Sequence, residues 1–370
     1  MPEPTPVAPR SLRHYLERSH NNLDVFRLIA ALAVIVGHSY VLAPAPGERD
    51  VVARLVGFTY SGALAVKVFF FLSGLVCANS LLDKRGALAF VVARVFRIFP
   101  ALIFTLIVTV FVVGPLASAL ASGEYFGHKQ TWRYLVANGL LRTEYHLPGV
   151  FLANPYAKAV NGSLWTLRHE VGAYLGLLAG ASLGLLYRRW VATVICALVI
   201  ADALLPAPLL LRTLGKNPEI RLLPSCFAAG VLLAVQRDVA TPRARWALAG
   251  LPIFLLCRTT HLAEPAFLAV VFALLLWLGG TRTVLSARMP ADFSYGVYLW
   301  GFPVAQLFAS RLAAQGPLVN CVATILGVLP LSVLSWYVVE KPAIHLGKRL
   351  VTQLGWSPRP RPALAPDPSP

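Results

Sequence analysis

Three ionisable side chains lie within an apolar stretch near the start of the chain. The stretch covers residues 22–38, reads NLDVFRLIAALAVIVGH, and contains Asp24, Arg27 and His38. A charged side chain near the middle of a bilayer costs about 2.5–3.5 kcal/mol on insertion scales, so such groups usually face a protein interior or a wet cavity. An imidazole in a dry pocket stays neutral and can act as a general base or a nucleophile. We therefore expect this kind of chemistry at His38.

The spacing of Arg27 and His38 places both on one helix face. They are eleven residues apart, about three turns of an α-helix with roughly 16 Å of rise. That face carries a cation near one end and an imidazole deep in the membrane. Two interpretations remain open: a functional pair, or an arginine that snorkels to the interface together with a hydrogen-bonded core histidine.

The second apolar run adds a lysine to these intramembrane charges. It contains KVFFFLSG, which includes Lys67, Ser73 and Gly74. Small residues such as Ser73 and Gly74 let helices approach closely, and we expect that role first, with Ser73 also a candidate for a cavity wall. Lys67 either snorkels to the outer interface or lines the same cavity as His38.

A pair of arginines one turn apart follows in the next connection. The segment ARVFRIFP contains Arg94 and Arg97 and ends at Pro100, which we expect to begin the third span. Two guanidiniums on one face can bind a polyanion such as phosphate through bidentate hydrogen bonds. Anchoring of a cytoplasmic loop explains one arginine but not the aligned pair. We therefore predict that the pair binds phosphate groups.

A long polar and aromatic connection, residues 122–162, leads into the segment NGSLWTLRHEVGAYL. Asn161 and Ser163 are expected to cap the helix that follows. Trp165 belongs either to the aromatic belt at the membrane interface or to a cavity wall.

Two glutamates lie close to predicted spans. Glu170 falls about two turns into the fourth span. Either Arg168 neutralises it, or it orients a catalytic imidazole or binds a hydroxyl-bearing acceptor. Glu340, at the cytoplasmic end of the last span, is predicted to be a structural ion-pair partner of Arg94 or Arg97.

The composition defines the class of protein. Of the 370 residues, 57% are hydrophobic and only 13% are charged, with a mean hydropathy of +0.66, whereas soluble domains carry about 25% charged residues. The sequence therefore predicts an all-α, polytopic membrane helix bundle. Apolar runs of about 20 residues indicate about ten transmembrane helices. These runs fall near 23–43, 59–82, 99–121, 163–186, 191–209, 221–236, 246–258, 265–280, 293–312 and 318–338. The short runs at 221–236 and 246–258 are candidates for half-spans or re-entrant elements.

The distribution of the +17 net charge argues against a nucleic-acid partner. Lysines and arginines cluster at alternate connections, which is typical of cytoplasmic loops and predicts that both termini are cytoplasmic. The clusters are Arg10, Arg13, Arg18; Lys84, Arg85, Arg94, Arg97; Arg188, Arg189; Arg237, Arg243, Arg245; Arg282, Arg288; and Lys341, Lys348, Arg349. We predict a multi-pass protein of a bacterial plasma (inner) membrane, in contact with the lipid bilayer and with no nucleic acid.

The two ends of the chain differ from its apolar centre. Residues 1–20 form a basic leader and residues 351–370 a Pro-rich tail, and we expect both to be disordered around one membrane domain at residues 21–350. No cleavable signal peptide is visible. The five cysteines are scattered without paired spacing, so we expect buried thiols and no metal site.

Six segments together resemble a known family. LDVFRLIAALAVIVGH, FFFLSG, ARVFRIFP, NGSLWTLRHE, SYGVYLWGFPV and VVEKP occur in the order expected for the membrane acyltransferase 3 family, across residues 22–349. The resemblance implies an acyl-CoA-dependent O-acyltransferase, most often an O-acetyltransferase, with no bound cofactor. Such an enzyme moves an acyl group from cytoplasmic acyl-CoA to a hydroxyl of an extracytoplasmic glycan or glycolipid, such as exopolysaccharide or lipopolysaccharide. Polysaccharide assembly proteins are a further class of partner.

The resemblance also implies roles for residues already singled out. His38 matches the family's essential histidine, and Glu170 its acidic residue after the Trp motif. Arg27, Arg94 and Arg97 match arginines that would hold acyl-CoA. Asp24, Lys67, Ser73 and Trp165 remain candidate cavity-lining residues.

The chain departs from the family pattern at Gly301, where many members have His. A catalytic role at that position is therefore not expected. Two other functions stay open: a transporter or flippase that uses the intramembrane charges as a relay, and a noncatalytic scaffold, which would leave the aligned charges without a purpose. Dependence on acyl-CoA separates the enzyme from the transporter, because a transporter has no need of a thioester.

Overall fold

The computed structural model describes residues 11–17, 22–84, 86–210, 217–281, 289 and 291–356. Most of the predicted leader and tail lies outside these residues. So do five basic residues of the predicted cytoplasmic clusters, namely Arg10, Arg18, Arg85, Arg282 and Arg288. The predictions for these residues are not tested by the structure.

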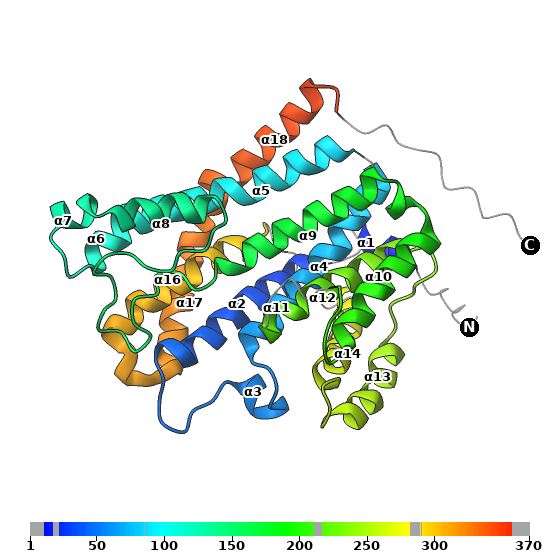
Figure 1. Cartoon of the computed structure of the whole chain (residues 1–370), viewed down its shortest axis with the longest axis horizontal. Helices are drawn as coiled ribbons and strands as arrows, with labels where there is room; N and C mark the ends of the chain where they lie inside the picture. The colour runs from blue at the N-terminus through cyan, green and yellow to red at the C-terminus, as the bar shows by residue number, and fades with distance from the viewer. Residues whose placement is uncertain are drawn as a thin grey trace, which may run out of the picture.

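Each of the ten apolar runs contains a helix, and the described part of the chain has no β-strand beyond two isolated bridges. The ten helices are α2 (Leu23–Leu42), α4 (Ser61–Lys84), α5 (Ala87–Val108), α9 (Trp165–Ser182), α10 (Arg189–Leu204), α12 (Leu223–Val235), α13 (Ala244–Cys257), α14 (Ala263–Gly279), α16 (Ser294–Leu312) and α17 (Gly316–Ser335). Shorter helices are α1 (Leu12–Leu16), α3 (Val51–Val56), α6 (Gly114–Ala117), α7 (Ser122–Gly127), α8 (Lys129–Gly139), α11 (Pro218–Arg221) and α18 (Lys341–Gln353). The predicted all-helical fold is thus confirmed for the described residues (Figure 1).

Four helical segments are long and apolar enough to cross a bilayer. They are Leu23–Leu42, Ser61–Asp83, Ala87–Ala117 and Ser294–Gln353, and the last contains α16, α17 and α18. Several long apolar helices make this a multi-pass membrane protein. The count of ten spans and the cytoplasmic position of the termini stay predictions.

The third span begins earlier than predicted. Pro100 does not start it but lies inside α5, and a π-helical turn, Thr109–Val113, continues this helix into α6. A proline inside a helix removes one backbone hydrogen bond, which neighbouring helices make tolerable in a membrane protein. Here α18 packs along α5, as Figure 1 shows, so tertiary contacts outweigh the local signal of the proline.

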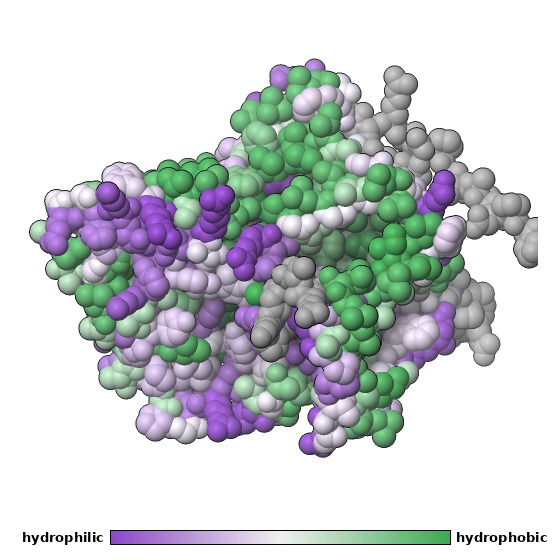
Figure 2. Space-filling model, in the orientation of Figure 1, coloured by the Kyte–Doolittle hydropathy of each residue, from purple (hydrophilic) through white to green (hydrophobic). Residues whose placement is uncertain are grey.

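The outer surface separates into polar and apolar regions. Figure 2 shows hydrophilic residues gathered over the end that carries α7 and α8, and hydrophobic residues over α18 and α10. Large apolar side chains exposed on α10 include Trp190, Val194, Ile195 and Leu198. Exposed side chains of this kind suit contact with lipid tails.

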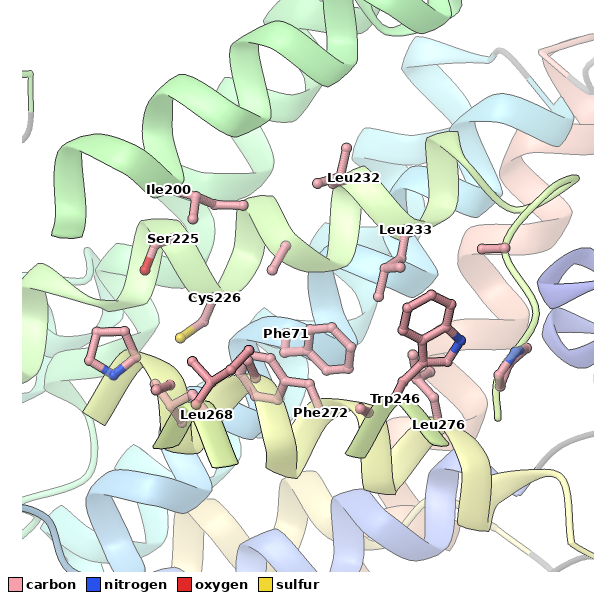
Figure 3. Close-up of a pocket in the computed structure, with 18 of the residues that line it drawn as sticks. Phe71, Ile200, Ser225, Cys226, Leu232, Leu233, Trp246, Leu268, Phe272 and Leu276 are labelled. Atoms are coloured by element: carbon pink, nitrogen blue, oxygen red, sulfur yellow. The ribbon is translucent and has the colours of Figure 1, made fainter. Parts of the chain in front are cut away.

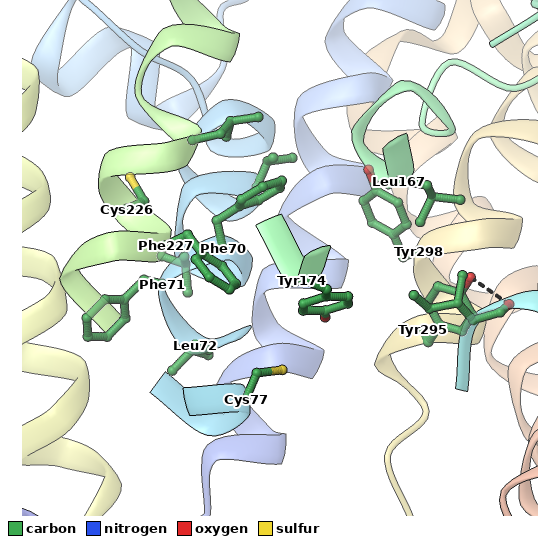
Figure 4. Close-up of a cluster of buried hydrophobic side chains, with 14 of the residues drawn as sticks. Phe70, Phe71, Leu72, Cys77, Leu167, Tyr174, Cys226, Phe227, Tyr295 and Tyr298 are labelled. Carbon is green, nitrogen blue, oxygen red and sulfur yellow. Dashed lines mark hydrogen bonds between the residues drawn. The ribbon is translucent and has the colours of Figure 1, made fainter. Parts of the chain in front are cut away.

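Helices α4 and α12 form the closest contact of the interior, and two glycines make it possible. A Cβ at Gly74 would lie 2.1 Å from the carbonyl oxygen of Phe227, and one at Gly230 would lie 2.1 Å from that of Phe71. The predicted role of Gly74 in close helix approach is therefore confirmed. Phe71 and Phe227 belong to the buried cluster drawn in Figure 4.

Gly230→Ala is expected to destabilise the bundle by about 1–3 kcal/mol, because the added methyl group must separate α4 from α12. Gly176→Ala is the matched control: Gly176 is exposed within α9, and a Cβ there meets nothing within 4 Å. That change should stabilise by about 0.5–1 kcal/mol through helix propensity. Thermal unfolding in detergent measures both, and equal shifts for the two variants would contradict the close contact.

Candidate functional site

Helix α2 directs both of its candidate residues toward α16. Nη1 of Arg27 lies 3.2 Å from Oδ2 of Asp292, two residues before α16 begins. The His38 ring packs edge-on against Phe302 of α16, with 4.9 Å between the ring centroids. The two side chains therefore mark the two ends of one interface, about three helical turns apart.

His38 lies in the wall of a small cavity of about 30 Å³. The polar and aromatic part of this wall consists of His38, Tyr60, Ser163, Trp165, Glu219 and Tyr298. Nδ1 of His38 and Oγ of Ser163 are buried without a hydrogen-bond partner. Buried polar atoms are nearly always bonded, so two unpartnered atoms in one wall indicate a place where a polar group of a ligand binds. The volume exceeds the roughly 10–15 Å³ that one water needs.

The NGSLW segment is held against α16 by hydrogen bonds. The side chain of Asn161 accepts from the backbone N–H of Ser163 at 3.0 Å and donates to the carbonyl of Leu299 at 3.0 Å. The hydroxyl of Tyr298 donates to the carbonyl of Ser163 at 2.8 Å. These bonds fix Ser163 and Trp165 beside His38.

The predicted capping role of Asn161 and Ser163 is wrong. The residue that precedes α9 is Leu164, and no side chain caps this helix. The amide of Asn161 is instead used by α16, a partner that is distant in sequence and therefore invisible to a local motif.

The packing of α2 against α16 accounts for a glycine at position 301. A Cβ at this position would lie 3.1 Å from Cγ1 of Ile35 on α2. A larger side chain here would press on Ile35, so the departure from the family pattern agrees with the packing.

Glu170 belongs to a second polar group, farther along the bundle. The hydroxyl of Tyr174 donates to Oε1 of Glu170, and Oγ of Ser73 donates to the same oxygen at 3.4 Å. Oγ of Ser73 also lies 3.1 Å from the Tyr174 hydroxyl. Figure 4 shows the Tyr174 ring near Cys77 of α4. Ser73 thus contacts Glu170 and Tyr174, whereas Trp165 lies in the His38 cavity.

Among the described residues, Glu170 forms no hydrogen bond with Arg168 or His38, the two side chains considered above as its partners. Arg168 donates from Nε to Nε2 of His169 at 3.1 Å, so it is not the neutralising partner. None of the hydrogen bonds that Glu170 makes among the described residues reaches His38. A role of Glu170 in orienting that imidazole therefore stays a prediction.

Arg94 and Arg97 share α5 but contact different groups. Arg97 places Nη2 at 2.6 Å from Asp292 and Nη1 at 2.6 Å from Glu340. Arg94 donates only weakly, to Sγ of Cys77 at 3.5 Å, and its Nε is buried without a partner. The predicted ion pair of Glu340 with one of these arginines is confirmed, and that arginine is Arg97.

Asp292 joins Arg27 to Arg97 and was not singled out from the sequence. Burial disfavours its charged form, but Arg27 and Arg97, together with hydrogen bonds from Ser294, outweigh this and hold the pKa of the carboxyl below its usual range. Asp292 therefore stays ionised at neutral pH. Its position in ADFSYG, just before an apolar run, is the one signal that could have drawn attention to it.

The two arginines predicted to bind phosphate differ in how free their guanidinium groups are to do so. The guanidinium of Arg97 is paired with two carboxylates. Nε of Arg94, in contrast, has no hydrogen-bond partner among the described residues. Asp24 lies exposed in the first turn of α2 and interacts electrostatically with Arg27. A role of these arginines in binding acyl-CoA stays a prediction, and Arg94 is the better placed of the α5 pair.

Lys67 does not snorkel. Its side chain is 1% exposed, with Nζ 2.6 Å from Oε2 of Glu219 and 2.8 Å from Oε1 of Glu264. Two carboxylates from distant segments satisfy the buried cation, so it has no need to reach the interface. Glu219 in turn forms part of the His38 cavity. Neither glutamate was identified from the sequence.

A much larger cavity among the described residues is a different space. It has a volume of about 680 Å³ and lies between α10, α12, α13 and α14, lined by side chains such as Phe71, Phe272 and Trp246 (Figure 3). Among the described residues that line it, Arg243 is the one charged side chain, and none carries a carboxylate or an imidazole. The described residues also hold no group of three or more His, Cys, Asp or Glu side chains that could bind a metal ion. The small cavity, whose wall includes His38 and Glu219, therefore stays the candidate for acid–base chemistry.

Comparison with known proteins decides the class of reaction. The family described as "acyltransferase domain", acyltransferase 3, matches residues 20–338. This chain belongs to the acyltransferase 3 family. It is 27% identical over 332 residues to a protein named O-acetyl transferase from Shigella phage Sf6, covering 87% of this chain and 95% of the relative. It is also 27% identical over 363 residues to nodulation protein 10 of Rhizobium leguminosarum bv. viciae, covering 90% and 95%. No solved structure matches the chain.

Membership of the acyltransferase 3 family makes the protein an acyltransferase and implies an acyl donor and an acceptor. It also disfavours the transporter, because an acyltransferase makes and breaks covalent bonds.

Proposed function

We propose that this acyltransferase transfers an acyl group, most often acetyl, from cytoplasmic acyl-CoA to a hydroxyl of an extracytoplasmic glycan. One observation carries the proposal: the buried, unpartnered Nδ1 of His38 shares a cavity wall with the unpartnered Oγ of Ser163. The name of the phage relative, O-acetyl transferase, supports an oxygen nucleophile and an acetyl group.

His38 is the proton acceptor in this proposal. A neutral imidazole takes the proton of the acceptor hydroxyl while that oxygen attacks the thioester carbonyl carbon. The carbon–sulfur bond breaks, and the departing sulfur takes the proton back from the imidazolium, which yields the ester and the free thiol of CoA. A route through an acyl-imidazole would use the same residue as a nucleophile and release the same products.

The donor approaches from the other end of α2. Arg27 lies about 16 Å from His38 along this helix, and Arg94 adds a guanidinium with an unpartnered Nε. These cations would hold the phosphates of CoA, because guanidinium groups match phosphate geometry. The pantetheine arm would then extend along α2 and bring the thioester to the edge of the cavity, beside His38.

The test is transfer of label from [¹⁴C]acetyl-CoA to envelope glycans in membranes that contain the protein. Membranes without the protein, and free [¹⁴C]acetate in place of the thioester, are the controls. We expect labelled glycan only when protein and thioester are both present. Absence of label in the complete reaction would contradict an acetyl-CoA-dependent enzyme, and label from free acetate would contradict the thioester donor.

A further inference from the structure

Glu219 provides a carboxylate at the opening of the cavity that contains His38. Its side chain is 33% exposed, and Tyr60 in the same wall is 37% exposed. Ser163 and Tyr298 are only 2% and 8% exposed. We therefore place the opening of the cavity beside Glu219 and Tyr60, where an entering ligand would meet the carboxylate.

Lys67 fixes the direction of this carboxylate. Its ammonium group binds Oε2 of Glu219 at 2.6 Å and is itself held by Glu264 at 2.8 Å. Among the described residues, Oε1 of Glu219 has no hydrogen-bond partner. One positive and two negative charges leave this triad with a net negative charge when all three groups are ionised. Oε1 of Glu219 can accept hydrogen bonds, and its charge repels anions.

We propose that Glu219 and Ser163 bind the acceptor, and that the acceptor group they recognise is an uncharged polyol, such as a sugar with neighbouring hydroxyls. This inference rests on the proposed function, because it supplies the acceptor site of that reaction. Glu219 accepts a hydrogen bond from one hydroxyl, while Ser163 contacts the neighbouring hydroxyl, which His38 deprotonates.

The size of the cavity defines how the sugar is placed. A volume of about 30 Å³ holds a hydroxyl group with its carbon but not a sugar ring. The ring therefore stays at the opening, against Tyr60, and only the reacting hydroxyl enters. A carboxylate at this opening disfavours acidic sugars and phosphate-bearing groups at the same position through charge repulsion.

The test compares Glu219→Gln with Glu264→Gln. Both side chains bind Lys67 and both variants remove one negative charge, but only Glu219 lines the cavity. The probe is de-O-acylated envelope polysaccharide from host cells that lack this gene, titrated in the [¹⁴C]acetyl-CoA assay. Glu219→Gln should raise the KM for polysaccharide about tenfold or more, because a charged hydrogen-bond acceptor is replaced by a weaker, neutral amide. Glu264→Gln should change it less than about twofold, because Lys67 keeps its 2.6 Å contact with Glu219 and the new amide oxygen can still accept a hydrogen bond from Lys67.

Direct binding separates this inference from the proposed function. Binding of the same polysaccharide to the detergent-solubilised full chain should weaken about tenfold in Glu219→Gln and stay unchanged in Glu264→Gln. If the wild type binds polysaccharide through Glu219 but transfers no label, the acyl-CoA reaction is wrong and the acceptor site stands. The acceptor site would be overturned if Glu219→Gln bound polysaccharide and showed a KM as the wild type does. Equal losses of binding in both variants would also overturn it. In either case the Lys67–Glu219–Glu264 triad would serve only to stabilise the fold.

Discussion

Replacing His38 by Ala is expected to abolish transfer of labelled acetyl, a loss of at least about 10²–10⁴-fold, because the reaction loses its proton acceptor. Among the described residues that line the cavity, His38 is the one imidazole. The measurement is the initial rate of glycan labelling from [¹⁴C]acetyl-CoA, normalised to the amount of protein in the membrane. Unchanged membrane insertion would show that the loss is chemical.

Two further variants serve as controls for this prediction. His38→Gln keeps much of the volume that packs against Phe302 but cannot accept the proton, so it should be as inactive as His38→Ala. His345→Ala removes an exposed histidine of α18 and should behave as the wild type. Retained activity in either His38 variant would show that another residue takes the proton.

Replacing Arg97 by Met is expected to destabilise the protein by about 3–5 kcal/mol, the usual cost of leaving a buried charge without its partner. Arg97 contacts two carboxylates at 2.6 Å, and the side chain of Glu340 is only 1% exposed. Thermal unfolding in detergent should show a midpoint lower by several degrees, and the amount of protein in membranes should fall.

A compensating change makes this second prediction specific. The double variant Arg97→Met with Glu340→Gln should recover part of the lost stability, because it removes the carboxylate that the single variant leaves unpaired. If Arg97 served only to bind the phosphates of CoA, the single variant would raise the KM for acetyl-CoA and leave the unfolding midpoint unchanged. That result would contradict the structural role.

Local patterns predicted much of the fold. Every apolar run became a helix, because hydropathy over a window of about 20 residues reports directly on burial in a bilayer or a core. The close approach at Gly74 followed from residue size in the same way. The errors occurred where a distant partner outweighed a local signal: Pro100 continues a helix that packs on α18, and Asn161 bonds to α16 instead of capping α9.

The sequence alone determined the helical membrane class, the family motifs and the placement of Arg27 and His38 on one face of a helix. These features depend on the neighbours of each residue along the chain. Only the tertiary structure decided which charges neutralise one another. Lys67 pairs with Glu219, which is 152 residues away in the sequence. Arg97 pairs with Asp292 and Glu340, which are 195 and 243 residues away. A buried charge must be paired wherever the packed helices bring an opposite charge within reach, and that position is set by the bundle as a whole.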